Sequence, residues 1–223
     1  MHLFYSRRSF GPLFKYATRE WATRLAREGD VRVSTLSDFR RAEAHDAERG
    51  DAGEGTRVLT SDLGRTYTKQ EDIPDFIGRG IELEDGGTIE FVGPHGFSSN
   101  REHADVYIYS VTERFDKQVM KRFGGACVRI SDSLGFFCAM DERLRSWLPG
   151  ARSLVADGVL DRCTYADRSQ HYKQVEPCED YFLKARGYAH QQEVRAAWTP
   201  VRRPLEPLAF RCPALTQFCE LYA

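Results

Sequence analysis

Short apolar runs separated by polar turns make up most of the chain, and several of them alternate with the two-residue period of a β-strand. Within residues 31–36, Val31 and Val33 fall on one side and polar residues on the other. The clearest strand pattern is VYIYSVT at 106–112. The same reasoning predicts further strands at 2–6, 125–131, 158–167, 193–198 and 207–212.

Three helices are indicated by apolar positions spaced three and four residues apart. The first is capped by Thr18 and ends at Gly29, and its apolar face holds Trp21, Ala22, Leu25 and Ala26. A short second helix covers residues 115–123. The third has a wide apolar face made of Leu134, Phe137, Met140, Leu144, Trp147 and Leu148.

The middle of the chain is polar. Residues 43–55 have no apolar period, so we expect a solvated loop there. Residues 56–92 carry turn signals near 62–64 and at 85–87, which predict inserted β-hairpins. With no internal repeat or linker visible, the patterns predict one α+β domain over residues 1–223, with a mainly antiparallel twisted sheet flanked by short helices.

Composition narrows the class of protein. Hydrophobic residues make up 41% of the 223 residues, and 32 Lys+Arg against 33 Asp+Glu leave a net charge of −1. That balance argues against a histone-like basic protein and against an acidic disordered tail. Neither a membrane-spanning apolar stretch nor a signal peptide is visible, so we expect a cytoplasmic protein that does not contact membranes.

Motifs of several common enzyme classes are missing from the sequence. It has no phosphate-binding G-x-x-x-x-G-K-[ST], no dinucleotide-binding G-x-G-x-x-G, no G-x-S-x-G and no H-E-x-x-H. The six cysteines and six histidines lack the spacing of zinc ligands, so we expect no metal among the site residues.

Three separated features carry candidate chemistry. The first, at residues 5–8 and 14–16, combines cations with aromatic rings, which suit a pyrophosphate and a planar base. The second is the Ser-Thr pair within residues 34–41, at the end of a predicted strand. The third is Gln191 and Glu193, which project on the same side if their strand begins early.

Each feature also has a simpler interpretation. The N-terminal arginines fit a strand end exposed to solvent, where their charges stabilise little. Ser37 or Asp38 fits the N-cap of a short helix. A Gln-x-Glu pair is common on surface strands.

Taken together and in this order, the three features resemble the ADP-ribosyltransferase fold family. The chain is also similar to the bacterial proteins of unknown function called the DUF2971 group. That second resemblance covers most of the chain in short pieces, namely 14–16, 34–39, 106–112, 125–130, 163–165 and 192–195.

The resemblance implies that NAD is the substrate and assigns residues to hold it. Arg7 or Lys15 would bind the phosphates, and Ser34 or Thr35 would order the nicotinamide pocket. The ring that stacks on nicotinamide would be one of three tyrosines, Tyr5, Tyr16 or Tyr109.

The resemblance also implies that Glu193 is the catalytic glutamate and that Gln191 contacts the acceptor. Nicotinamide leaves as a neutral molecule, so one carboxylate that stabilises an oxocarbenium-like ribose is sufficient, whereas most glycosidases use two. The acceptor would be a protein or a nucleic acid, and with water the enzyme would be an NAD glycohydrolase. Such proteins are often bacterial toxins or phage-defence effectors, some of them held by a partner or antitoxin.

Two alternatives stay open. A non-catalytic binding or sensor domain on the same fold predicts a Glu193 that is buried and paired, for example with Arg195 or Arg129. An enzyme predicts a Glu193 that faces a cleft, with Gln191, a cation and a ring in reach.

The other alternative is a metal-dependent nuclease that uses the acidic loop at 46–54, through Asp46, Glu48, Asp51 and Glu54. His171 and His190 are secondary candidates for general bases.

Overall fold

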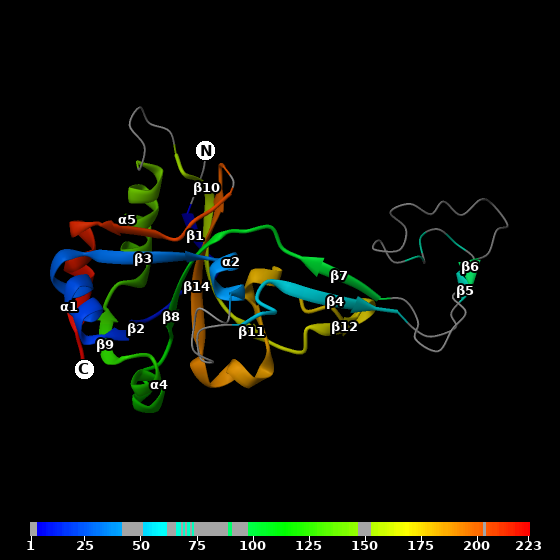
Figure 1. The fold of residues 1–223 in the computed structure, drawn as a ribbon, viewed down its shortest axis with the longest axis horizontal. Coiled ribbons are helices and arrows are strands. Elements are labelled where there is room, and N and C mark those ends of the chain that lie inside the picture. The colour runs from blue at the N-terminus through cyan, green and yellow to red at the C-terminus, as the bar shows by residue number, and fades with distance from the viewer. Residues whose placement is uncertain are drawn as a thin grey trace.

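The computed structural model describes residues 4–41, 51–61, 66–67, 69, 71, 73, 89–90, 98–146, 153–202 and 204–223, with backbone alone at 66–67 and 89–90. Over these residues the protein is α+β, with a curled, mainly antiparallel sheet and few helices (Figure 1). The predicted class is confirmed at that level. Among the described helices, none combines the length and apolar character that crossing a membrane requires.

Nine strands of the described chain form the main sheet. They are β1 (Phe4–Ser6), β2 (Leu13–Thr18), β3 (Asp30–Thr35), β8 (Tyr107–Thr112), β9 (Gly125–Ile130), β10 (Val155–Arg162), β14 (Glu193–Pro200), β15 (Leu208–Arg211) and β16 (Cys219–Leu221). The main path runs β1-β10-β14-β8-β2-β9-β16, and only β1 and β10 pair in parallel. All seven strands predicted from alternation are present, with ends shifted by a few residues.

The main sheet forks along β8. Its last residue, Thr112, pairs with Phe14 of β2, whereas its first two residues pair with β3. The strands β2 and β3 are joined by helix α1 (Arg19–Glu28), which Thr18 caps and Gly29 ends, as predicted. Because β2 and β3 share opposite ends of β8, they diverge and leave an opening between them.

Helix α5 (Ser133–Arg145) covers one face of the sheet and contributes Phe136, Phe137, Met140 and Leu144 to the core. The predicted face was wrong at Leu134, which is 50% exposed, and Trp147 and Leu148 lie outside the described residues. The indole of Trp198 on β14 donates to Asp141 of α5 over 3.1 Å, which ties helix to sheet.

The shorter helices and turns lie around this core. They are α2 (Leu36–Arg40) and α4 (Lys117–Arg122), and the 3₁₀ turns η3 (Tyr172–Gln174), η4 (Asp180–Phe182), η5 (Arg186–Gln191) and η6 (Pro213–Phe218). Thr35 caps α2, so the prediction of Ser37 or Asp38 as its cap was wrong.

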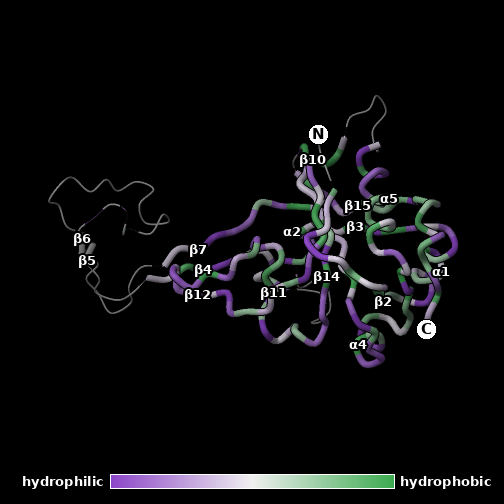
Figure 2. Tube along the Cα trace, turned by 180° about the vertical axis from the view of Figure 1, so that it is seen from behind, coloured by the Kyte–Doolittle hydropathy of each residue, from purple (hydrophilic) through white to green (hydrophobic). Residues whose placement is uncertain are grey.

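A smaller sheet reaches away from the main one and carries mostly polar strands (Figure 2). It is ordered β12-β4-β7, from Ser169–His171, Thr56–Thr60 and Ser98–Glu102. The pairs β5 (Thr66–Tyr67) with β6 (Ile89–Glu90), and β11 (Thr164–Tyr165) with β13 (Leu183–Lys184), are separate. The first predicted hairpin was wrong because β4 pairs with β7, not with the next strand. The turns at 62–64 and 85–87 lie outside the described residues.

Candidate functional site

The opening between β2 and β3 is a cavity of about 280 Å³, floored by residues 108–112 of β8. Residues far apart in the sequence meet on its wall. Six of the nine residues singled out from the sequence line it, namely Lys15, Tyr16, Ser34, Tyr109, Gln191 and Glu193. The fork of the sheet therefore gathers residues from each of the three sequence features at one place.

A tight turn brings Gln191 and Glu193 to the cavity. The turn η5 ends at Gln191 and β14 begins at Glu193, where the strand was predicted to start, so a turn and not a shared strand face places Gln191 beside Glu193. Between them Gln192 takes a left-handed conformation at φ 44°, which costs a non-glycine residue about 1 kcal/mol. Two hydrogen bonds hold the turn: the Gln192 carbonyl accepts from the Glu113 backbone N–H, and the Glu193 N–H donates to the side-chain hydroxyl of Tyr165.

The Glu193 carboxylate is buried and bonded through both oxygens. Oε1 accepts from the Ser110 hydroxyl at 2.6 Å and from Nε of Arg195 at 2.5 Å. Oε2 accepts from Nζ of Lys184 at 2.6 Å. The same Lys184 ammonium donates to Oε1 of Gln191 at 2.8 Å, so it joins both predicted catalytic residues.

These charges control how Glu193 titrates. Burial raises the pKa of its carboxyl, but the positive charges of Arg195 and Lys184 outweigh burial and hold the pKa well below its usual range. Glu193 is therefore a carboxylate at neutral pH. It can stabilise positive charge, but it cannot serve as a general acid.

A second carboxylate completes the network. Nη1 of Arg195 donates to Oε1 of Glu54 at 2.6 Å, and both side chains are only 1% exposed. Residues 51–55 form a turn, as expected for a loop, but the expectation that it is solvated is wrong at Asp51 and Glu54, because Arg168 and Arg195 hold their carboxylates in the interior. Residues 43–50 lie outside the described part of the chain.

The strands on either side of the opening carry the other predicted residues, Lys15 and Tyr16 on β2 and Ser34 on β3. Nζ of Lys15 donates to the Ser110 carbonyl at 2.7 Å and lies 4.3 Å from the centre of the Tyr109 ring. Tyr109 is 2% exposed and its ring packs on core phenylalanines, so little of it is open to a ligand. The Ser34 hydroxyl accepts from Arg32 at 2.8 Å.

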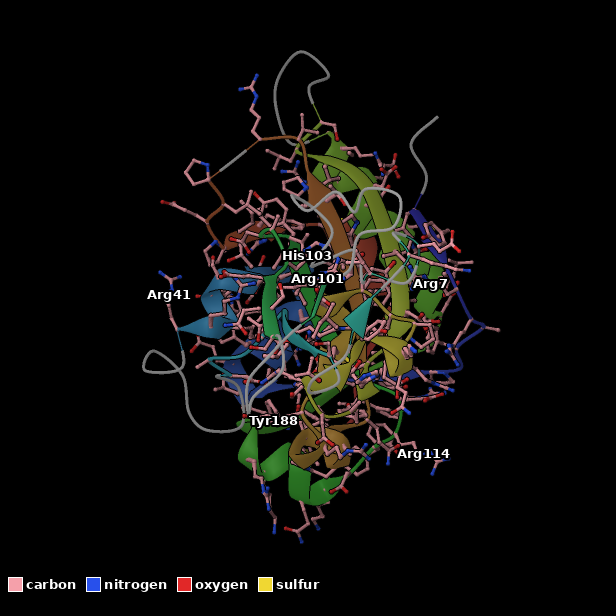
Figure 3. The ribbon with its side chains drawn as sticks, turned by 90° about the vertical axis from the view of Figure 1, so that its right-hand side faces the viewer. Arg7, Arg41, Arg101, His103, Arg114 and Tyr188 are labelled. Atoms are coloured by element: carbon pink, nitrogen blue, oxygen red, sulfur yellow. The ribbon has the colours of Figure 1, made fainter. Side chains whose placement is uncertain are left out.

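Three predicted residues do not line this cavity. The Arg7 guanidinium donates to Glu179, and Figure 3 shows Arg7 far from Tyr188, whose ring lies 4.8 Å from Nζ of Lys184. Tyr5 lines a separate cavity of about 130 Å³. Thr35 is fully buried and caps α2.

Sequence reasoning missed Lys184, Ser110 and Arg32. The signal for Lys184 was a single cation within the apolar stretch YFLKA, since an amine buried there requires a charged partner. Ser110 and Arg32 interrupt their strands without forming a recognisable pattern. Among described residues, four cationic side chains and two carboxylates line the cavity, namely Lys15, Arg32, Lys184 and Arg195 with Asp30 and Glu193. Asp38 and Glu54, which do not line it, pair with Arg32 and Arg195.

Among the described residues, nothing supports a metal site in the acidic loop or a histidine general base in the cavity. They contain no cluster of three metal-ligating side chains, and Asp51 and Glu54 are each paired with an arginine. Asp46 and Glu48 lie outside the described part of the chain. Neither His171 nor His190 lines the cavity.

The chain was compared with models of protein families, with curated proteins and with solved structures, and none of them matches it.

Proposed function

We propose that the protein has an ADP-ribosyltransferase-like fold and cleaves the bond between nicotinamide and ribose in NAD⁺, transferring ADP-ribose to an acceptor. One observation supports this most: Lys15, Tyr16, Ser34, Gln191 and Glu193 converge on a single cavity. They come from three distant parts of the sequence and are the residue types that the reaction needs.

In this reaction the bond between C1′ of ribose and the pyridinium nitrogen breaks, and its electron pair leaves with neutral nicotinamide. The ribose becomes oxocarbenium-like, and a fixed carboxylate nearby stabilises that positive charge. Glu193 fits the role because it stays ionised and Ser110 and Arg195 hold it in place. Of the cations on the wall, Lys15 is the one that suits the pyrophosphate.

Lys184 must move for this chemistry. Its ammonium is hydrogen-bonded to Oε2 of Glu193, and its positive charge repels the positive charge that develops on the ribose beside this carboxylate. Once Lys184 leaves, Glu54 still neutralises Arg195, so Glu193 presents an unbalanced negative charge to the ribose. An incoming pyrophosphate supplies the new partner for the displaced ammonium.

The test is release of nicotinamide from NAD⁺, comparing the wild type with Glu193→Gln at a temperature where both are folded. Glu220→Gln is the matched control, because Glu220 pairs with Arg129 at the surface, remote from the cavity. We expect release by the wild type and the control and at least about a hundredfold less by Glu193→Gln. Equal release by all three would refute the role of Glu193.

A second candidate is a domain that binds the nucleotide without cleaving it. It is favoured by the pairing of both Glu193 oxygens with hydrogen-bond donors, two of them cations. A binding domain was expected to have a buried, paired Glu193, and an enzyme a Glu193 that faces a cleft beside Gln191. Both expectations are met, since Glu193 is paired with Arg195 and also lines a cavity beside Gln191. NAD⁺ binding with no release, even after Lys184→Met frees Oε2, would establish this candidate.

A further inference from the structure

Helix α4 lies at the edge of the cavity and is strongly basic. The segment that leads from the cavity into α4 starts at Thr112, and the helix is followed directly by Phe123; both residues line the cavity. Between them, Arg114, Lys117, Lys121 and Arg122 are all exposed. This local excess stands out in a chain whose net charge is −1.

Helix stability does not account for these charges. Cations favour the last turn of a helix, which suits Lys121 and Arg122, but they oppose the positive end of the helix dipole. Lys117 occupies the first turn, which contains no acidic residue, and Arg114 precedes it. Figure 3 shows the Arg114 side chain pointing away from the body of the protein. The cap Asp116 is the one carboxylate in residues 114–122, and it accepts from the backbone of Gln118 and Val119.

The approach to α4 is rigid. The Tyr16 hydroxyl on the cavity wall donates to the Arg114 carbonyl at 3.1 Å and accepts from the Asp116 N–H at 2.6 Å. The basic helix is therefore fixed relative to the cavity. A chain bound along α4 would be held at a constant distance from Glu193.

Aromatic rings lie at the same edge. Trp21 lines the cavity and is 36% exposed, with the Arg24 guanidinium 4.6 Å from its ring centre. Phe123 is half-buried and also lines the cavity. The start of α1 and the end of α4 lie at the same end of the β2–β9 pair, because Thr18 before α1 pairs with Gly125 after α4. Cations for phosphates beside rings for unstacked bases are the two elements that bind single-stranded nucleic acid.

We propose that α4, Trp21 and Phe123 form a docking surface for single-stranded nucleic acid, which would present one nucleotide to the cavity. Binding itself is independent of the proposed NAD⁺ cleavage. The further claim that the bound strand accepts ADP-ribose does rest on the proposed NAD⁺ cleavage. In that step a nitrogen or oxygen of the nucleotide forms the new bond to C1′, and nicotinamide leaves with the electron pair of the old bond. Any proton on the attacking atom passes to water.

Fluorescence anisotropy with a labelled single strand of about 12 nucleotides tests the surface, because such sites cover about 4–16 nucleotides. If the four cations each contact a phosphate, affinity should fall about 50-fold between about 50 and 200 mM salt. Lys117→Glu/Lys121→Glu should weaken binding at low salt and reduce that fall to about sevenfold. Trp21→Ala should weaken binding by at least about fivefold through lost stacking.

The matched control is Arg27→Glu/Arg202→Glu, which makes the same change in net charge at exposed sites. Arg27 lies in the last turn of α1, and Arg202 lies beyond the end of β14 opposite Glu193. The control should bind like the wild type. The proposal is overturned if no binding occurs at low salt, if the control weakens it equally, or if duplex DNA or polyglutamate competes as well as the single strand.

Nicotinamide release separates this proposal from the proposed function. Lys117→Glu/Lys121→Glu should release nicotinamide at the wild-type rate when no nucleic acid is present, since neither lysine lines the cavity. Binding of the strand without any NAD⁺ cleavage would leave the surface standing and refute the enzyme. NAD⁺ cleavage without strand binding would refute the docking surface and leave the proposed enzyme standing.

Discussion

Replacing Glu193 with Gln should destabilise the protein sharply. The carboxylate is 7% exposed and balances two buried cations, Lys184 and Arg195, while Glu54 balances only one. Glu193→Gln keeps the shape but leaves one buried positive charge uncompensated. Breaking a buried ion pair in this way costs about 3–5 kcal/mol. That is a large part of the roughly 5–15 kcal/mol by which proteins of this kind are stable.

The assay is urea unfolding followed by tryptophan fluorescence, with thermal unfolding as a second readout. For a chain of this length we expect the unfolding temperature to fall by about 6–20 °C. Removing the excess charge should restore stability, so Glu193→Gln/Lys184→Met should be about 1–3 kcal/mol more stable than the two single changes predict by addition.

Glu220→Gln again serves as control, because its partner Arg129 is at the surface and such pairs contribute about 0–1 kcal/mol. A Glu193→Gln variant within about 1 kcal/mol of the wild type, with no coupling to Lys184, would refute the buried network.

Three further predictions concern the same site. Lys184→Met should raise kcat for nicotinamide release, because Oε2 of Glu193 is freed, and raise KM, because a phosphate partner is lost; a fall in kcat would show that Lys184 assists the reaction. The lowered pKa of Glu193 means that the unfolded chain binds more protons near pH 4, so stability should be full above the ordinary carboxyl range and fall as the pH drops below it. This acid-side slope should be smaller in Glu193→Gln, and an unchanged slope would contradict the assignment. Gln192→Gly should raise the free energy of unfolding by up to about 1 kcal/mol in urea, since glycine adopts φ 44° without strain, and a decrease would show that the side chain stabilises the turn.

The sequence predicts elements where local rules decide them. The strand at β8, the capped helix α1 and the late strand β14 follow from alternation and capping residues that are close in the chain. Pairing between distant segments does not follow from such rules. For that reason β4 was expected to form a hairpin with its neighbour, although it pairs with β7 and β12.

The site shows the same limit. Residue types indicated Lys15 and Glu193, but only the fork of β8 decides which candidates share a cavity, and it separates Arg7 from them. Lys184 carries no motif, and its importance comes from burial beside Glu193, which depends on how β13 and β14 come together.

The most direct test of the central claim is a calorimetric titration of NAD⁺ into the wild type, Lys15→Met and Arg7→Met. Lys15 lines the cavity, whereas Arg7 pairs with Glu179 outside it. We predict that the wild type and Arg7→Met bind equally and that Lys15→Met binds about tenfold or more weakly, as expected for the loss of a charged hydrogen bond to phosphate. Absence of binding by the wild type, or weaker binding by Arg7→Met alone, would contradict an NAD⁺ site in this cavity.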